Sequence, residues 1–340
     1  MSPPLSSLGE FGLVALFERA AQARHPATRV GIGDDCAVLD LGGLERVLLT
    51  TDLLLERVHF EAAWLSAEDL GHKSMAVNLS DVAAMGGEAV AALLALGLPP
   101  GLEVAWVEGL RDGLVGCARA YGLELVGGDT VSAPGGAVVC LTVLGRAPAD
   151  EVVLRSGGQP GDRVLATGPL GDSAAGLHLL RGGGAGLAPE DRAALLLAHR
   201  RPEPQLALGR ELARRRLAHA MIDVSDGLVQ DLGHICERSG LGAELDADGL
   251  PLSAAARRLA ALEGLDARDW ALSGGEDYRL LFCVPGGLAA EAERVCRGLG
   301  LEAAELGRLG AGRGVRVRRD GQVSAPADQG FDHFGPRGAR

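Results

Sequence analysis

Short acidic segments flanked by glycine, serine or threonine interrupt this chain at seven places. Each follows an apolar run typical of a strand, or precedes a run with helical spacing. A single segment of this kind is typical of a turn or a helix cap. Seven such segments in one chain favour a fold in which the ends of strands and the starts of helices bring their carboxylates together at one site. The segments are Gly33-Asp34-Asp35, Thr50-Thr51-Asp52, Asn78-Leu79-Ser80-Asp81, Gly127-Gly128-Asp129-Thr130, Gly171-Asp172-Ser173, Asp223-Val224-Ser225-Asp226-Gly227 and Ser273-Gly274-Gly275-Glu276-Asp277.

The residue types in these segments favour divalent-metal and phosphate chemistry. They contain carboxylates and hydroxyls but no histidine or cysteine, and hard oxygen ligands are those that Mg²⁺ prefers. Magnesium sites of this kind usually share the ion with substrate phosphates. Phosphoryl transfer depends mainly on positioning and charge neutralisation, which carboxylate-held ions supply. The sequence therefore predicts a Mg²⁺-dependent enzyme that transfers a phosphoryl group.

Competing motifs are absent from the sequence. A Walker loop needs Gly-Lys-Ser/Thr, whereas Lys73, the only lysine, follows His72. Gly31-Ile32-Gly33 has the spacing that opens a dinucleotide fingerprint, but Cys36 replaces the last glycine and two aspartates would repel a pyrophosphate unless metals intervene. Neither Gly-x-Ser-x-Gly nor His-Glu-x-x-His occurs. P-loop, Rossmann, serine-hydrolase and zincin sites are therefore disfavoured.

Apolar periodicity predicts strands alternating with helices along the whole chain. Ser66 opens a predicted helix that runs through Met85, and Gly122 ends the next, which begins near Glu103. A segment rich in Pro, Gly and charge at 147–161 then marks a boundary. We predict a mixed α/β fold of the α+β type with two domains, residues 1–148 and 149–340. The predicted strands are 46–51, 88–98, 123–126, 138–145, 163–167, 220–224, 279–284 and 315–319.

Composition limits the compartment and the partners. The net charge of −12 disfavours nucleic-acid binding, because a phosphate backbone demands clustered cations. No apolar run reaches the roughly 18 residues of a membrane span, and Met1–Gly12 lacks the features of a secretory signal. The six cysteines are widely spaced, which predicts reduced packing residues and neither disulfides nor zinc. We expect a cytoplasmic protein without membrane contact.

Two further features leave alternatives open. Thr167–Gly176 combines a strand, a glycine turn and a helix start, which presents N–H groups to an anion or lets the helix pack closely. His59 follows the Thr50–Asp52 segment and is either a site residue or a core or capping histidine.

Taken in order, these segments resemble the thiamine-monophosphate kinase family, whose members convert thiamine phosphate to thiamine diphosphate with ATP. The resemblance extends from Gly9 to Phe334. Its most specific segments are GIGDDCAV from Gly31, TTDLLLERVHF from Thr50, HKSMAVNLSDVAAMG from His72, GGDT from Gly127, RSGGQPGD from Arg155, GDSAAGL from Gly171, IDVSDGL from Ile222 and SGGEDY from Ser273.

The resemblance implies the fold of the aminoimidazole-ribonucleotide synthetase superfamily. Its N-terminal domain binds ATP and Mg²⁺ and forms a barrel-like sheet interface in a homodimer, and its C-terminal domain is α/β. It also implies several Mg²⁺ ions and direct γ-phosphoryl transfer without a covalent catalytic residue. The implied metal ligands are Asp35, Thr50, Thr51, Asp52, Asp81, Asp129, Asp223 and Asp226. The implied ATP contacts are Tyr121, Gly128, Asp129, Arg155 and Ser225, and the implied substrate contacts are His59, Glu276 and Phe331.

Physical reasoning gives several of these residues a role. Arg155 is suited to clamp a phosphate, because guanidinium binds phosphate in a bidentate manner. Glu276 suits either the cationic thiazolium or the aminopyrimidine of thiamine, and Phe331 stacks on that ring or simply packs.

Three positions depart from the family pattern. Leu53 replaces a polar residue or methionine, Arg57 replaces a glycine, and Phe331 replaces tyrosine or tryptophan. Arg57 either adds a phosphate contact or replaces a flexible turn. We expect the three departures to affect the affinity for the substrate.

Other functions within the superfamily fit less well. A selenophosphate synthetase would carry a reactive Cys and Lys near the N-terminus, and neither occurs in Met1–Val30. A carbamoyl-dehydrating maturation protein would end in cysteine, whereas this chain ends in Arg340. The alternatives kept are another ATP-using synthetase of this superfamily and a non-catalytic nucleotide-binding dimer.

Overall fold

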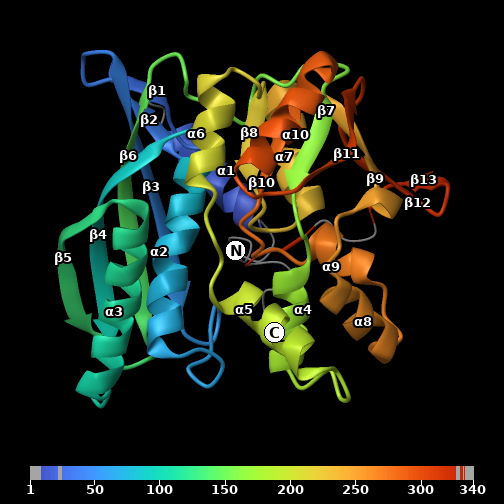
Figure 1. The fold of residues 1–340 in the computed structure, drawn as a ribbon. Helices are drawn as coiled ribbons and strands as arrows, with labels where there is room; N and C mark the ends of the chain where they lie inside the picture. The colour runs from blue at the N-terminus through green and yellow to red at the C-terminus, as the bar shows by residue number, and fades with distance from the viewer. Residues whose placement is uncertain (1–8, 22–24, 327–329, 332, 334–340) are drawn as a thin grey trace, which may run out of the picture.

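The computed structural model describes residues 9–21, 25–326, 330, 331 and 333. Most of the Met1–Gly12 segment and Phe334, the last residue of the resemblance, therefore lie outside the described residues. Two mixed β-sheets form the frame of the molecule, one built before and one after the chain passes Pro148 (Figure 1). The predicted mixed α/β architecture with two domains is confirmed.

The first sheet has six strands in the order β1-β2-β3-β6-β4-β5. Neighbouring strands are antiparallel except β4 and β5, which are parallel. Parallel neighbours need a crossover, and the helix between them supplies it. The strands are β1 (Thr28–Val30), β2 (Ala37–Leu39), β3 (Glu45–Leu55), β4 (Glu88–Leu98), β5 (Glu124–Ser132) and β6 (Val138–Pro148).

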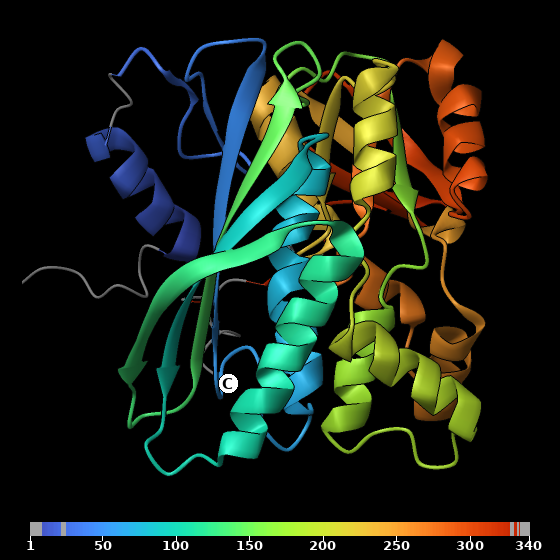
Figure 2. The same ribbon diagram turned by 60° about the vertical axis from the view of Figure 1, so that its left-hand side comes forward.

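Helices α2 (Ala67–Ala84) and α3 (Val104–Tyr121) cover one face of this sheet (Figure 2). The predicted caps are confirmed: Ser66 Oγ accepts the N–H of Asp69 at 3.0 Å, and Gly122 ends α3 with φ 77°. Among the described helices, none packs on the opposite face of β4 and β5. That face therefore lies open in the single chain.

The second sheet has seven strands in the order β13-β12-β9-β11-β7-β10-β8, antiparallel except for β12 beside β9. Its strands are β7 (Arg163–Thr167), β8 (Ala220–Asp223), β9 (Gly242–Asp246), β10 (Leu280–Val284), β11 (Ala303–Gly310), β12 (Gly314–Arg319) and β13 (Gln322–Ser324). The remaining helices are α1 (Gly9–Ala21), α4 (Asp172–Leu180), α5 (Pro189–Arg200), α6 (Leu206–Arg214), α7 (Leu228–Ser239), α8 (Ala254–Glu263), α9 (Ala267–Ser273) and α10 (Ala289–Gly298).

Strand alternation joins the two halves of the molecule. Leu165, Met221 and Phe282 pack into the core that surrounds α2, whereas the alternate residues Ile222 and Leu281 pack into a second core with α7. A strand presents successive side chains to opposite faces, so both faces of the second sheet are buried. Helix α2 contacts β3 of the first sheet and β8 of the second. Residues from both sheets are therefore held close together around α2.

The sequence misjudged where strands of the first sheet end: the strand expected over 123–126 runs as β5 to Ser132, and the strand expected over 46–51 is also longer. The first apolar strand was expected to end at Asp52, but β3 continues to Leu55 and pairs with β6 along its whole length. The hydrogen bonds of β6 extend the strand through its polar residues. Thr50, Thr51 and Asp52 consequently lie within a strand and alternate between its two faces.

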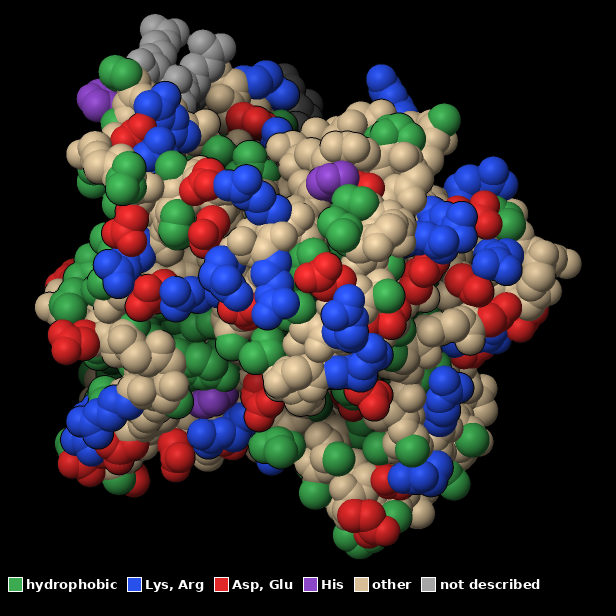
Figure 3. Space-filling model, turned by 45° about the horizontal axis from the view of Figure 1, so that its top comes forward, with side chains coloured by type: hydrophobic (Ala, Val, Ile, Leu, Met, Phe, Trp, Pro, Cys, Tyr) green, Lys and Arg blue, Asp and Glu red, His purple; other side chains and the backbone are tan. Residues whose placement is uncertain are grey.

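The surface mixes charges of both signs. On the face shown in Figure 3, arginine and acidic side chains lie beside one another, in keeping with pairs such as Arg318 with Asp246 and Arg268 with Asp248. Within the described part of the chain, we find no helix with the length and apolar character needed to cross a bilayer.

Helices α2 and α3 approach so closely that glycine is required between them. A Cβ at Gly113 would lie 1.9 Å from the carbonyl oxygen of Glu68, whereas a Cβ at Gly116 on the same helix meets nothing within 4 Å. We predict that Gly113→Ala lowers the free energy of unfolding by about 1–3 kcal/mol through overpacking. Gly116→Ala should instead be neutral or stabilising by up to about 1 kcal/mol, because alanine favours helix. Chemical denaturation of both variants measures the difference, and equal effects would contradict the packing argument.

Candidate active site

A cavity of about 410 Å³ lies among β3, α2, the loop after β8 and the segment that follows α9. Twelve of the fifteen site residues predicted from the sequence line it. They are Asp35, Thr50, Thr51, Asp52, His59, Asp81, Arg155, Asp223, Ser225, Asp226, Glu276 and Phe331. The other three, Tyr121, Gly128 and Asp129, do not line this cavity.

Three carboxylates meet at the inner end of the cavity. Asp35, Asp81 and Asp223 each offer an oxygen, and these oxygens all lie within 4.8 Å of one another. Asp35 precedes β2, Asp81 belongs to α2 and Asp223 ends β8, so the cluster joins both halves of the molecule. Oδ2 of Asp223 is buried and accepts no hydrogen bond from the described residues. This arrangement of oxygen donors fits a hard divalent cation such as Mg²⁺.

Burial and mutual repulsion raise the pKa values of these acids. The pKa of Asp223 rises to about 8, through burial first and the charge of Asp35 second. The pKa of Asp81 is also raised, by burial and by the charges of Asp52 and Asp223. For Asp52, burial and the charges of Asp226 and Asp35 raise the pKa to about 6. Like charges this close disfavour full ionisation, so a bound cation would stabilise the site.

Arg155 provides the positive charge that the described chain places at this end of the cavity. Its guanidinium binds both oxygens of Asp35, with Nη2 at 2.8 Å and Nε at 3.2 Å. Its backbone N–H donates to Asp34 at 3.2 Å, and Asp34 also accepts the N–H of Asp35 at 3.1 Å. Asp34 thus anchors the loop that carries Asp35. Arg155 both pairs with a predicted metal ligand and lines the cavity, where a phosphate can reach it.

The middle of β3 directs its polar side chains to two faces. Thr50 donates its hydroxyl to Asp81, and the N–H of Asp52 donates to Asn78 at 3.1 Å, so this face of the strand meets α2. Thr51 belongs to the opposite face, where its hydroxyl donates to the carbonyl of Leu141 at 2.8 Å. The continuous strand therefore presents Thr50 and Asp52 to the acidic cluster and Thr51 to the open side of the sheet.

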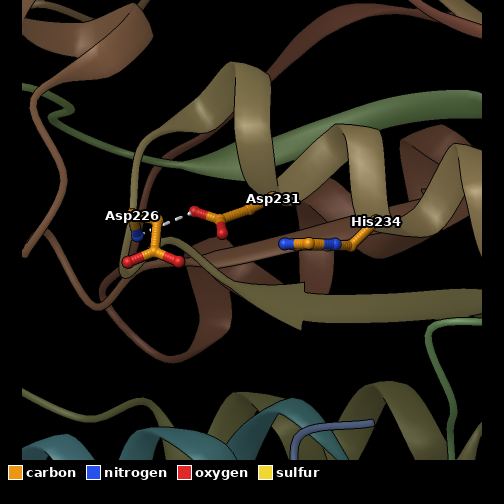
Figure 4. Close-up of side chains that lie close together, drawn as sticks. All are labelled: Asp226, Asp231 and His234. Carbon is orange, nitrogen blue, oxygen red and sulfur yellow. Dashed lines mark hydrogen bonds between the residues drawn. The ribbon is translucent and has the colours of Figure 1, made fainter. Parts of the chain in front are cut away.

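The Asp226 loop is held by a buried aspartate that the sequence did not single out. Oδ2 of Asp231 accepts the N–H groups of Ser225, Asp226 and Gly227 at 3.1–3.2 Å. Figure 4 shows Asp231 and His234 on α7 beside Asp226, and the three side chains offer ligand atoms within 4.8 Å of one another. Because Asp231 fixes the turn before α7, Asp226 is held at the cavity wall, where its Oδ2 accepts a hydrogen bond from Gln230 at 3.0 Å.

Rings and imidazoles line another part of the cavity, next to the Asp226 loop, where Phe331 N donates to Asp226 O at 3.1 Å. His59 accepts the N–H of Leu55 through Nδ1 at 3.0 Å, and its Nε2 lies 3.3 Å from Nε2 of His333. Burial and the neighbouring His333 lower the pKa of His59 to about 4, so it is neutral near pH 7. Phe331 meets His333 edge to face at 4.7 Å, and its carbonyl accepts a bond from Gln230 at 2.8 Å. A flat ring system fits this part of the cavity.

The glycine turn before α4 is closed by a carboxylate of the chain itself. Asp277 accepts the N–H groups of Gly171 at 2.7 Å and Ser173 at 3.3 Å. A Cβ at Gly171 would lie 2.6 Å from Ala271 N, and one at Gly176 would lie 2.3 Å from Leu195 O. Of the two readings left open, the structure supports close packing, because these N–H groups already have a partner.

Glu276 reaches the cavity through an unusual backbone conformation. Its φ of 57° and the φ of 49° at Tyr278 are left-handed values that side chains rarely adopt. Backbone bonds from Glu276 N to Ser225 O at 2.7 Å and from Tyr278 N to Val224 O at 2.8 Å hold the segment in place. Backbone strain of this kind is kept only where surrounding contacts hold the residue in place, and such positions are often functional sites.

The three predicted residues outside the cavity lie at the other edge of the first sheet. Gly128 pairs with Leu94, which pairs with Leu141, which pairs with Asp52. Three strand spacings of about 4.8 Å place Gly128 roughly 14 Å from Asp52. Asp129 follows on the exposed β5, and Tyr121 ends α3 half-buried. A Cβ at Gly128 would lie 1.8 Å from Leu94 O, so close strand approach explains this glycine.

Several cavity residues were missed by the sequence. Glu10, Trp64, His199 and His333 line the cavity, and none belongs to the seven acidic segments. The one available signal was proximity in the sequence, because His333 lies two residues after Phe331. Arg57, a departure from the family pattern, does not line the cavity and occupies a left-handed turn with φ 68°.

Comparison with known proteins agrees with this geometry. The chain matches the family described as AIR synthase related protein, N-terminal domain, over residues 33–147, and the corresponding C-terminal domain over residues 159–320. Thiamine-monophosphate kinase of Salmonella typhimurium is 38% identical over 327 residues, which cover 96% of this chain and 98% of that protein.

Solved structures give the same result. One described as AaThiL complexed with AMPPCP and TMP has a TM-score of 0.86 at 35% identity and covers 98% of this chain and 100% of that one. Thiamine-monophosphate kinase from Stenotrophomonas maltophilia K279a has a TM-score of 0.76 at 38% identity, covering 93% and 98% of the two chains.

The raised pKa values predict how stability depends on pH without metal. Between the ordinary value of 3.8 and about 8, folded Asp223 retains a proton that the unfolded chain releases. The free energy of unfolding should therefore fall as pH rises through this window. In EDTA at pH 8, we expect Asp223→Asn to be at least about 1 kcal/mol more stable than the unchanged protein.

Thermal unfolding from pH 5 to 8 measures this effect. Mg²⁺ should raise the melting temperature of the unchanged protein and have little effect on Asp223→Asn. Asp112→Asn, on the exposed side of α3, is the control and should follow the unchanged protein in both conditions. Equal Mg²⁺ stabilisation of both aspartate variants would show that Asp223 does not bind the ion.

Proposed function

The chain belongs to the thiamine-monophosphate kinase family, and we propose that it phosphorylates thiamine phosphate to thiamine diphosphate with ATP and Mg²⁺. The observation that carries the proposal is the convergence of Asp35, Asp81 and Asp223 within 4.8 Å, beside an arginine and at one end of a cavity. A bound cation shared with substrate phosphates would make such a cluster favourable. We also propose residues 1–148 and 149–340 as the domains and the cytoplasm as the location.

The chemistry we propose is a direct transfer. An oxygen of the thiamine phosphate attacks the γ-phosphorus of ATP, a new P–O–P bond forms, and the bond to the β-phosphate oxygen breaks as ADP leaves. The attacking phosphate is already largely anionic near neutral pH, so it needs no general base and no covalent catalytic residue. Positioning in the cavity supplies most of the acceleration.

The residues of the chain divide this work. We propose that Asp35, Asp81 and Asp223 hold Mg²⁺, with Thr50, Asp52 and Asp226 as further ligands, and that Thr51 and Asp129 are ligands on the open face of the sheet. The bound ions would neutralise the charge of the triphosphate. Arg155 and Ser225 would contact the phosphates of ATP from the same wall of the cavity. His59, Glu276 and Phe331, which line the same cavity, would contact thiamine.

In a homodimer, the predicted residues outside the cavity would also contribute to the site. In the register of the sheet, Leu53, Cys140, Ala95 and Asp129 form one cross-strand row. Cross-strand partners share a face, so Asp129 and Thr51 belong to the open face that α2 and α3 do not cover. This places Asp129 on a surface that a second copy can cover, and we propose that Tyr121, Gly128 and Asp129 contact ATP in that assembly.

The open face has the character of an interface. Large apolar side chains remain exposed along it: Leu53 is 46% exposed, Leu93 49% and Val131 57%. Contiguous apolar surface of this kind marks association sites. A second copy of the sheet would bury it and complete the barrel-like interface that the family resemblance implies.

The activity is tested by product analysis. Purified protein with Mg²⁺, ATP and thiamine phosphate should form thiamine diphosphate and ADP in equal amounts, and EDTA should stop the reaction. Asp52→Asn should lower kcat by about 10²–10³-fold with an unchanged fold, because it removes preorganised charge from the reacting phosphates.

Chromatography of the products and circular dichroism of the variant provide the two readouts. Turnover with another phosphate or amine acceptor but none with thiamine phosphate would favour another synthetase of the superfamily. Tight nucleotide binding without any ADP release would favour the non-catalytic dimer.

The dimer is tested by a charge on the open face. Leu93→Asp should convert the protein to a monomer, since an uncompensated carboxylate cannot be buried in an apolar interface. Leu262→Asp is the matched control, because Leu262 is 55% exposed on α8, far from this face in the fold. Light scattering after gel filtration gives the mass of each variant. A monomeric unchanged protein with full activity would contradict the proposed assembly.

A further inference from the structure

Lys73 is the only lysine of the chain, and the structure buries it beside the cavity. It lies on α2 with its side chain 1% exposed, and its Nζ is 2.9 Å from Oε1 of Glu276. The pair joins α2, on the first sheet, to the segment after α9 in the second half of the molecule. Lys73 does not line the cavity itself, whereas Glu276 does. The ammonium therefore lies behind the carboxylate as seen from the cavity.

The second carboxylate oxygen of Glu276 lies close to a buried histidine. Oε2 lies 3.4 Å from Nδ1 of His199, and that nitrogen is 3.1 Å from the hydroxyl of Ser173. Both His199 and Ser173 are buried. Together with the backbone bond from Glu276 N to Ser225 O at 2.7 Å, the ion pair with Lys73 and the close approach of His199 limit the orientations of the carboxylate. A side chain restrained by an ion pair and at the backbone is preorganised for recognition.

The charge balance around Glu276 is close to neutral. Burial alone would raise the pKa of Glu276, but the charge of Lys73 outweighs burial and holds that pKa below its ordinary value. His59 and His199 face the same carboxylate, and burial lowers the pKa of each to about 4, so both are neutral near pH 7. Tyr278 adjoins it, and burial raises the pKa of that phenol. One negative charge therefore faces one positive charge.

We propose that Lys73 is a positioning residue for the acceptor substrate, which pairs with Glu276 so that this carboxylate accepts a hydrogen bond from a neutral amino group. This deepens the proposed function and rests on it. Thiamine offers Glu276 two partners, the cationic thiazolium and the neutral aminopyrimidine. If Glu276 bound the thiazolium, two cations would share one carboxylate, because the buried ammonium of Lys73 already balances its charge. The amino group needs only an oriented hydrogen-bond acceptor, and without one its N–H groups would be buried unpaired.

A purely structural ion pair is the alternative to this role. Buried pairs often add little net stability compared with apolar residues, so burial by itself does not assign a function. Glu276 differs from a structural partner in two respects. It occupies a strained left-handed backbone conformation, and its side chain is still 28% exposed to the cavity. A structural role predicts effects on folding only, whereas positioning predicts selective effects on one substrate.

Steady-state kinetics separate the two roles. Lys73→Met should raise KM for thiamine phosphate about tenfold or more, with KM for ATP within about twofold, because only the acceptor end loses its oriented carboxylate. Ser74→Ala is the matched control: Ser74 is the next residue of α2, fully buried, and donates to Leu70 O at 2.8 Å. The control should leave both KM values unchanged. Lys73→Met with a lowered melting temperature and unchanged KM values would overturn the proposal.

The double variant covers the case in which Lys73→Met alone does not fold. Lys73→Met with Glu276→Gln leaves no unpaired buried charge and should fold. Its KM for thiamine phosphate should equal that of Glu276→Gln, because Lys73 acts only through Glu276. A further tenfold increase in the double variant would show an independent role for Lys73 and contradict the inference.

Two substrate analogues test which group Glu276 recognises. Oxythiamine phosphate, which has an oxygen in place of the amino group, should lose about tenfold or more in kcat/KM with the unchanged protein and much less with Glu276→Gln. An analogue with a neutral ring in place of the thiazolium should be used nearly as well as thiamine phosphate. The reverse order of preference would overturn the proposal. Absence of thiamine diphosphate formation by the unchanged protein would instead contradict the proposed function, so the two failures are distinguishable.

Discussion

The structure depends on keeping several negative charges together in a buried place. Asp35, Asp81 and Asp223 come within 4.8 Å although burial and repulsion both oppose their ionisation. The fold provides one compensating charge through Arg155, which binds Asp35 with two nitrogens. Without a bound cation, the raised pKa of Asp223 relieves the remaining repulsion by protonation, so the same feature that weakens the metal-free protein at higher pH suits the site to a cation.

The scaffold resists that repulsion by rigid packing. Helix α2 carries Asp81 and Lys73 between the two sheets, and Gly71 and Gly113 let α3 approach it at backbone distance. The core around α2 includes residues of both sheets, so the acids contributed by each half cannot easily separate. Close packing of this kind converts small local shifts into large free-energy changes. The site is therefore preorganised by the core around it.

Polar anchors then fix the loops that the core does not reach. Asp231 holds the Asp226 loop through three N–H groups, Asp277 holds the turn before α4, and Asp34 holds the segment of Arg155. Each of these three aspartates lies close to a candidate ligand and accepts hydrogen bonds from backbone N–H groups. In the sequence Asp34 and Asp277 are indistinguishable from ligands, because both belong to acidic glycine-rich segments, whereas Asp231 lies outside those segments.

The sequence by itself identified the kinase family, the helix caps at Ser66 and Gly122 and most strands, because acidic turns, capping residues and apolar periodicity are local signals. It identified twelve residues that line one cavity. Only the tertiary structure decided which faces the side chains of β3 occupy, that Gly128 lies three strands from Asp52, and that Lys73 meets Glu276. These facts depend on strand register and on helix packing between distant segments. Such contacts arise from burial and shape complementarity across the whole fold, which no local pattern encodes.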